Sequence, residues 1–327
     1  MTSSPVDRRT FLAGAAGSLT LAASAAAGRD AAGPAAQPAW PSVSPKRSLR
    51  LGAPIWPASD DPDDQARAHR EKGYRAGYCP DIPLGDADRL RATEAAFARH
   101  GVVIAEVGRW VNLLAADPAE RRRNLQTVTD GLALAEAVGA RCCVDIAGSF
   151  NPDSWYGPDP ENLSERFFGA AVENARAIID AVKPTRTTFC YEMMAWSLPD
   201  SPDAALRLAR AVDRKAFSIH LDACNLVSSP TRYYHSSDLI RECYAKLGPM
   251  IASVHVKDLT WDIEMALHFR EVRAGLGSID HGVWLAEHAR HTPEVPLMLE
   301  HLPSEAEYDA ARDRIFAVGR EVGVGFD

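Results

Sequence analysis

Residues 187–223 read TTFCYEMMAWSLPDSPDAALRLARAVDRKAFSIHLDA and contain the pattern that decides the fold. Two short apolar runs, at 187–193 and 217–223, flank an amphipathic helical stretch at 202–212. Apolar runs with little polar alternation are typical of parallel strands that are buried on both faces. A strand, a helix and a second strand in this order predict one unit of a parallel sheet.

The same alternation continues in both directions along the chain. Further apolar runs occur at 49–55, 74–79, 102–107, 142–147, 251–256 and 295–299, and further helical stretches at 118–138, 162–182 and 304–322. Eight strand–helix units in about 280 residues are the size of a TIM barrel. We therefore predict an α/β fold, a single-domain (β/α)8 TIM barrel over residues 49–327. An open doubly wound sheet is the alternative, but it usually has a Gly-rich turn after its first strand, whereas this chain has Pro54-Ile55-Trp56-Pro57 there.

Composition excludes several classes of protein. The chain has 327 residues, of which 46% are hydrophobic and 24% charged, as in ordinary globular domains. A formal net charge of −8 argues against a nucleic-acid partner, which requires a basic surface. No apolar run of about 18 residues follows the N-terminal region, so we predict no integral membrane segment. Cys142, Cys143, Cys190 and Cys224 fall in apolar runs and are predicted to be core residues.

The N-terminal residues resemble an export signal. Asp7-Arg8-Arg9-Thr10-Phe11-Leu12 forms a twin-arginine core, and a weakly apolar stretch leads from it to Ala25-Ala26-Ala27. Asp7 stands where such signals usually have Ser or Thr. We predict a Tat signal peptide at 1–27, recognised by the Tat translocase, and a periplasmic location. Residues 28–48 are rich in Ala, Pro and Ser and are predicted to be a disordered tether.

Four predicted strands end in residues that bind metals. In a TIM barrel the carboxyl ends of the strands meet on one face, so side chains from successive strand ends converge. Three carboxylates and one imidazole suit Mn²⁺, Mg²⁺ or Co²⁺ better than a structural zinc ion, which favours thiolate or imidazole. We expect a divalent ion, Mn²⁺ first and Mg²⁺, Co²⁺ or Zn²⁺ as alternatives. Each residue alone is more often a helix cap or a solvated loop residue. The four residues are Glu192, Asp222, His255 and Glu300.

These residues and their surroundings resemble a known family, the xylose isomerase-like TIM barrels of the sugar phosphate isomerase/epimerase superfamily. The resemblance covers about residues 49–322. It is carried by Glu192, His220-Leu221-Asp222, His255-Val256-Lys257-Asp258, Gly275-Leu276-Gly277-Ser278-Ile279-Asp280 and Leu299-Glu300-His301. It implies a metal site formed by Glu192, Asp222, His255 and Glu300. It also implies that Glu192 and Glu300 flank the substrate and move its proton.

Two positions depart from the ketose 3-epimerases of that superfamily. Asn225 replaces a substrate-binding His, and Leu198 replaces a second Glu. We therefore expect a different substrate. The glycine pair Gly275 and Gly277 is interpreted, as the resemblance implies, as the turn leading into helix eight, with Asp280 as its N-cap, and not as a phosphate-binding loop.

Aromatic and polar residues near the strand ends predict a carbohydrate pocket. Trp56, Trp110, Trp155, Trp196 and Trp261 all follow predicted strands. Aromatic faces combine a large apolar area with a polar edge, although ordinary loop packing is the alternative for each. The residues that we expect to contact the substrate are Trp56, Glu106, Trp110, Trp196, His220, Asn225, Arg232 and Arg273.

Such a site predicts proton transfer on a keto-sugar. A divalent ion that binds two adjacent oxygens of a hydroxy-ketone acidifies the C–H between them and stabilises an enediolate. Glu192 and Glu300 would remove and return the proton, and Lys257 would polarise an oxygen or move a proton. We predict a metal-dependent isomerase or epimerase that acts on an extracytoplasmic keto-sugar or related polyol. The alternatives are a lyase or dehydratase acting on a 3-keto-glycoside or inosose-like substrate and, more remotely, a non-catalytic sugar-binding protein. A homo-oligomer is left open.

Overall fold

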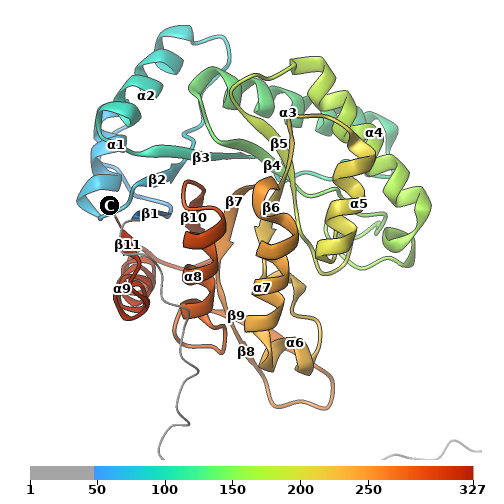
Figure 1. Cartoon of the computed structure of the whole chain (residues 1–327). Helices are drawn as coiled ribbons and strands as arrows, with labels where there is room; N and C mark the ends of the chain where they lie inside the picture. The colour runs from blue at the N-terminus through green and yellow to red at the C-terminus, as the bar shows by residue number, and fades with distance from the viewer. Residues whose placement is uncertain (1–47, 327) are drawn as a thin grey trace, which may run out of the picture. The chain divides into compact units, whose positions relative to one another are not determined.

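A computed structural model describes residues 48–326 of the chain. The predicted signal peptide at 1–27 and all but the last residue of the predicted tether lie outside these residues. The described part contains eight parallel strands that form a closed barrel surrounded by helices (Figure 1). The order is β1-β2-β3-β4-β5-β6-β7-β10, and pairing of β10 with β1 closes the ring. The predicted TIM barrel is thus confirmed, and the open sheet is excluded.

The strands agree with the predicted runs, with small shifts at their ends. Pro54 has no N–H to donate to a neighbouring strand, and the first strand ends two residues before it, at Gly52. A short strand, β11, pairs with the start of β1 outside the ring. The strands of the barrel and this addition are β1 (Ser48–Gly52), β2 (Ala76–Tyr78), β3 (Val103–Gly108), β4 (Cys142–Asp145), β5 (Thr188–Glu192), β6 (Phe217–Asp222), β7 (Ile251–Val256), β10 (Pro296–Leu299) and β11 (Gly325–Phe326).

The helices begin where the sequence supplies capping residues. Asp117, Ser201 and Ser304 each accept a hydrogen bond from a backbone N–H of the first turn that follows, which satisfies donors that a helix leaves unpaired. Two helices have the predicted bounds, α3 (Pro118–Val138) and α5 (Pro202–Val212). The others are α1 (Pro62–Glu71), α2 (Ala87–Arg99), α4 (Glu165–Val182), α6 (Pro230–Tyr234), α7 (Ser236–Leu247), α8 (His281–His291) and α9 (Glu305–Val322), with short 3-10 turns at Pro160–Leu163, Cys224–Leu226 and Gly248–Met250.

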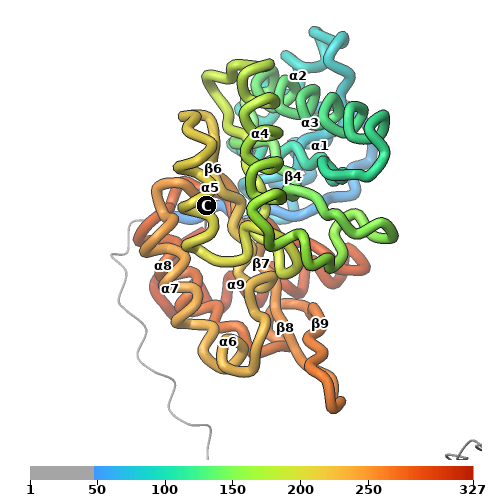
Figure 2. The backbone as a smooth tube through the Cα atoms, turned by 90° about the vertical axis from the view of Figure 1, so that its right-hand side faces the viewer, coloured from blue at the N-terminus to red at the C-terminus, as the bar shows by residue number. Residues whose placement is uncertain are grey.

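The core fills the space between the barrel and the helices. Figure 2 shows the helices on the outside of the strands, where their apolar faces pack. Cys142, Cys143, Cys190 and Cys224 are buried, as predicted. No helix within residues 48–326 is both long and apolar enough to cross a bilayer.

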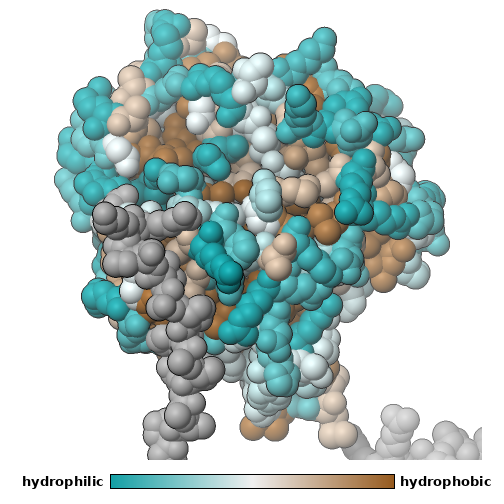
Figure 3. Space-filling model, in the orientation of Figure 1, coloured by the Kyte–Doolittle hydropathy of each residue, from teal (hydrophilic) through white to brown (hydrophobic). Residues whose placement is uncertain are grey.

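The segment after β7 is a β-hairpin, which the sequence did not predict. Strands β8 (Asp258–Trp261) and β9 (Phe269–Val272) pair antiparallel. The hairpin extends away from the barrel, at the bottom of Figure 1, and its tip exposes Ile263 and Met265. In Figure 3 hydrophilic side chains cover much of the visible face, with brown apolar patches between them and a small one at the lower edge. The hairpin matters for the site because β9 brings Glu271 to the barrel mouth.

The glycine pair after the hairpin wraps around a carboxylate of the chain itself. Asp258 accepts hydrogen bonds from the backbone N–H groups of Gly275, Gly277 and Ile279 at 2.8–3.0 Å. Gly275 has φ +91°, a conformation that other residues rarely adopt. Asp280 then caps α8 by accepting from the N–H of Val283, as predicted.

Replacing Gly277 by Ala is expected to destabilise the fold. A Cβ at this position would lie 2.2 Å from both Asp258 Oδ1 and the backbone oxygen of Leu259, so the loop has to shift. We expect Gly277→Ala to lower the free energy of unfolding by about 1–3 kcal/mol, as measured by urea denaturation. The control is Gly85→Ala, where a Cβ meets nothing within 4 Å. Equal stabilities of the two variants would contradict this account of the loop.

Candidate metal and active site

Four strand ends bring the predicted metal ligands together. Glu192 is the last residue of β5, Asp222 the last of β6, His255 lies in β7, and Glu300 follows β10. These are neighbouring strands of the barrel. One donor atom from each residue lies within 4.8 Å of the donor atoms of the other three. We call these four residues the strand-end set.

The imidazole of His255 is held between carboxylates. Its Nδ1 lies 2.9 Å from Glu300 Oε1 and 3.2 Å from Glu192 Oε1. Its Nε2 lies 3.0 Å from Glu106 Oε1, on the opposite side of the ring. The other oxygen of Glu106 lies 3.0 Å from Nε2 of the buried His220. A carboxylate behind a histidine fixes the orientation and tautomer of the ring, as in many metal sites.

Asp222 and Lys257 meet at the base of the pocket. Backbone N–H groups of Cys224 and Asn225 donate to Asp222 Oδ1 and fix the carboxylate. The other carboxylate oxygen, Asp222 Oδ2, is buried and faces Lys257. The ammonium group of Lys257 forms ion pairs with Asp222 Oδ2 at 2.7 Å and with Glu300 Oε1 at 2.5 Å.

The electrostatics of the strand-end set fit a divalent cation. Burial raises the pKa of Asp222 to about 6; Lys257 opposes this rise, and Glu192 adds to it. Burial alone would lower the pKa of His255, but the charges of Glu300 and Glu106 raise it well above its usual value. Buried carboxylates this close together need positive charge. Three carboxylate oxygens and one imidazole nitrogen are the donors that such an ion takes.

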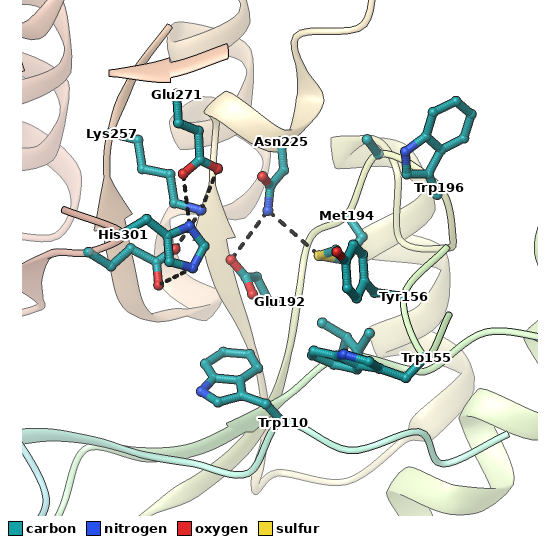
Figure 4. Close-up of a pocket in the computed structure, with 13 residues that line it drawn as sticks. Trp110, Trp155, Tyr156, Glu192, Met194, Trp196, Asn225, Lys257, Glu271 and His301 are labelled. Atoms are coloured by element: carbon teal, nitrogen blue, oxygen red, sulfur yellow. Dashed lines mark hydrogen bonds and ion pairs between the residues drawn. The ribbon is translucent and has the colours of Figure 1, made fainter. Parts of the chain in front are cut away.

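The strand-end set opens into a cavity of about 590 Å³. Figure 4 shows Glu192 between two groups of side chains, with Lys257, Glu271 and His301 on one side and Trp155 and Tyr156 on the other. The amide nitrogen of Asn225 donates to Glu192 Oε1 at 3.3 Å. The predicted residues among those that line the cavity are Trp110, Trp155, Glu192, Trp196, Asn225, Lys257 and Glu300. The cavity therefore has one charged and one aromatic side.

The sequence did not identify Glu271 and His301 as a pair. Nδ1 of His301 lies 2.8 Å from Glu271 Oε2, and Lys257 Nζ lies 3.3 Å from Glu271 Oε1. Burial disfavours the charged form of Glu271, but His301 and Lys257 together outweigh this effect, and the pKa of Glu271 is lowered. His301 has φ +58°, a strained conformation that is often found at functional sites. The strand-end motif Leu299-Glu300-His301 contained the signal for His301, whereas Glu271 required knowledge of the hairpin.

Several residues that were predicted to contact substrate lie away from this cavity. Glu106 and His220 are buried beneath His255. Trp56 is exposed and contacts the ring of Tyr308, with 5.9 Å between the ring centroids. Arg232 donates to the backbone oxygen of Leu226.

Two further predicted residues also lie outside the cavity. Arg273 pairs with Glu307 at 2.9 Å and lines a small adjoining cavity of about 220 Å³. Trp261 is exposed on the hairpin, in β8. The structure thus brings Glu192 and Glu300 of the strand-end set to the cavity, together with three of the five tryptophans that follow predicted strands.

Comparison with known proteins supports the fold. The family model described as "Xylose isomerase-like TIM barrel" matches residues 64–317. No curated protein sequence matches the chain. A xylose isomerase-like TIM barrel protein from Mycobacterium smegmatis, solved in complex with magnesium, has a similar structure, with a TM-score of 0.58 and 18% identity. The alignment covers 86% of this chain and 100% of that chain.

Two enzymes are similar to the same extent. For the 3-keto-D-glucoside 4-epimerase of E. coli the TM-score is 0.60 at 13% identity, and the alignment covers 84% of this chain and 100% of that one. For the probable 3-DHS dehydratase of Bacillus anthracis the TM-score is 0.59 at 15% identity, with coverage of 83% and 99%. At such low identity, these likenesses establish a shared fold.

Proposed function

Because the chain belongs to the xylose isomerase-like TIM barrel family, we propose that it is a sugar isomerase or epimerase that depends on a divalent metal ion. Its substrate is a keto-sugar or a related polyol. The observation that carries this proposal is the strand-end set, in which three carboxylates and one imidazole have their donor atoms within 4.8 Å of one another beside a cavity. A divalent cation bound there supplies charge that polarises a substrate carbonyl and acidifies the adjacent C–H.

Glu192 and Glu300 are placed to move the proton. They stand on β5 and after β10, at the two ends of the strand-end set, and both line the cavity. One carboxylate takes the proton from the C–H beside the carbonyl, and the other returns a proton from the opposite side. Return to the same carbon inverts its configuration. Return to the former carbonyl carbon gives the isomer, and the hydroxyl proton then passes to the former carbonyl oxygen.

The other residues of the cavity hold the substrate. Lys257 is 5% exposed and lines the cavity, and its ammonium group can donate to an oxygen that gains negative charge. The amide of Asn225 stands beside Glu192 and can donate to a hydroxyl group. Trp110, Trp155 and Trp196 offer aromatic surface to the C–H face of a sugar ring.

Elimination is the second candidate reaction. Removal of the same proton leads to elimination when the carbon next to the deprotonated one, β to the carbonyl, carries a leaving group. A dehydratase is among the proteins of similar fold, which favours this alternative over a binding protein. The substrate would then be a 3-keto-glycoside or an inosose-like compound.

A product screen separates these functions. Purified protein loaded with Mn²⁺ or Mg²⁺ is incubated with keto-hexoses and 3-keto-glycosides, and the products are identified by chromatography. Formation of an isomer that stops with a chelator supports the proposal, and release of an aglycone or water supports the lyase. Binding without any conversion over the whole set contradicts both enzymatic functions.

We further propose that the substrate is encountered outside the cytoplasm, because Arg8 and Arg9 lie in a twin-arginine core. Replacing both by Lys is expected to abolish export of folded protein, since the Tat receptor reads the arginine pair. The measurement is the amount of protein in periplasmic and cytoplasmic fractions. A matched change outside the core, Arg29→Lys, should leave export intact. Unchanged periplasmic protein in the Arg8→Lys, Arg9→Lys variant would show that another route is used.

A further inference from the structure

The reaction cavity adjoins a second cavity of about 510 Å³. Both cavities are lined by Trp110, Glu300 and His301, so these three residues stand at the boundary between them. Glu300 belongs to the strand-end set. A molecule that occupies both cavities therefore passes one of the two carboxylates that we assign to proton transfer.

The second cavity differs from the first in chemistry. Its walls come from the segments after β1 and β2 and from α1, α2 and α9, and the apolar part is formed by Pro54, Ile55, Pro57, Pro80, Phe97 and Tyr308. Glu300 is the one carboxylate among the described residues that line it. The first cavity, in contrast, is also lined by Glu192, Lys257 and Glu271. The first cavity thus suits a polyol, and the second suits an apolar group.

Two polar side chains of α1 in this wall have unsatisfied atoms. Gln65 and His69 are four residues apart on α1 and line the second cavity. Gln65 Oε1 and His69 Nδ1 are buried, and neither has a hydrogen-bond partner within residues 48–326. His69 itself is only 2% exposed. Buried polar atoms without partners are rare, and each calls for an explanation; a ligand that carries a hydroxyl group provides one.

Size also separates the two cavities. Pockets of about 300–1,000 Å³ are typical for whole small-molecule ligands, so the first cavity alone accommodates a sugar. The second is then available to another part of the same molecule. Proline rings and the side chains of Phe97 and Tyr308 give it flat hydrocarbon surfaces, which fit a planar ring.

We propose that the second cavity is a subsite for an apolar, planar ring that carries a hydroxyl group and is joined to the sugar. This inference rests on the proposed function, and it identifies the substrate class as an aryl glycoside of a keto-sugar. The sugar occupies the first cavity beside the strand-end set, the aromatic ring occupies the second, and the link between them lies near Trp110 and Glu300. The hydroxyl group of the ring hydrogen-bonds with Gln65 and His69.

The test compares three keto-glycosides that share one sugar and differ only in the aglycone: methyl, phenyl and 4-hydroxyphenyl. Binding to the metal-loaded full chain is measured by calorimetry. We expect the 4-hydroxyphenyl compound to bind at least 10-fold more tightly than the methyl compound, with phenyl between them. In Ile55→Trp, which fills the second cavity, the ratio of the 4-hydroxyphenyl affinity to the methyl affinity should fall to near one. In Gln65→Leu, the advantage of hydroxyphenyl over phenyl should be lost.

The control variant is Ile263→Trp, which introduces the same side chain at the exposed hairpin tip. It should leave the relative affinities of the three glycosides unchanged. Equal affinities of the three glycosides for the wild-type chain would overturn the proposal, as would full retention of the ratios in Ile55→Trp and Gln65→Leu. If none of the glycosides binds, the proposed function has failed, and the subsite is then tested with phenol alone. Saturable binding of phenol in an NMR titration, weakened in Ile55→Trp, supports the subsite; its absence overturns it.

Discussion

Replacing Glu192 or Glu300 by Gln is expected to lower turnover by at least about 100-fold, the contribution of a positioned acid or base. The amide has nearly the same shape as the carboxylate and keeps one oxygen for a metal ion, but it cannot take a proton. Each variant should therefore retain part of its metal affinity while losing the reaction. The measurements are kcat on the substrate found in the screen and metal content by elemental analysis.

Isotope exchange should distinguish the two glutamates. The variant that keeps the carboxylate facing the acidic C–H still exchanges that hydrogen with deuterium from solvent, and the other does not. Glu242→Gln on α7 removes the same charge at the outer surface and serves as the control. Near wild-type turnover in both metal-loaded variants would mean that another group moves the proton. Lys257, which lines the cavity, would then be the next candidate.

Asp222→Ala is expected to remove the metal ion while the barrel stays folded. The change deletes one of the four donors and leaves a hole beside Lys257, which pairs with this carboxylate at 2.7 Å. Loss of a group that only supports a ligand already weakens metal binding by about 10–100-fold, so loss of a ligand itself should weaken it further. Metal titration calorimetry measures the affinity, and circular dichroism checks the fold.

Asp145 provides a matched control for this experiment. It is the last residue of β4, fully buried, and outside the strand-end set. Burial raises its pKa well above the usual value. Its Oδ1 accepts hydrogen bonds from the backbone N–H groups of Val111 and Ile146, and the amide oxygen of Asp145→Asn can accept the same bonds. Metal affinity should stay at the wild-type level in Asp145→Asn. Full metal occupancy in Asp222→Ala would contradict the ligand assignment.

The fold was predictable because its signals are local and repeated. The helices α3 and α5 match their predicted bounds, since Asp117 and Ser201 mark the starts and the apolar spacing marks the lengths. The hairpin of β8 and β9 was not predicted, because its strands pair with each other outside the barrel and each has only four residues. Its alternating pattern is too short to distinguish from a loop.

The candidate site was predictable where strand order alone determines proximity. The strand-end set follows from four neighbouring strands, and its members do converge. Strand order could not show that Glu106 lies under His255, because that depends on which way each side chain leaves its strand. The same holds for the pair of Glu271 and His301, which joins the hairpin to the end of β10. The second cavity depends on residues from seven separate segments, which no local pattern connects.

Proton NMR in D₂O tests the central claim most directly. Keto-sugars or 3-keto-glycosides are incubated with the metal-loaded protein, and the loss of each C–H signal is followed over time. We predict that one C–H beside the carbonyl exchanges with solvent, that a chelator stops the exchange, and that added metal restores it. Exchange that persists in Asp222→Ala, or that is absent over the whole substrate set with metal-loaded wild-type protein, would contradict a metal-dependent proton transfer at this site.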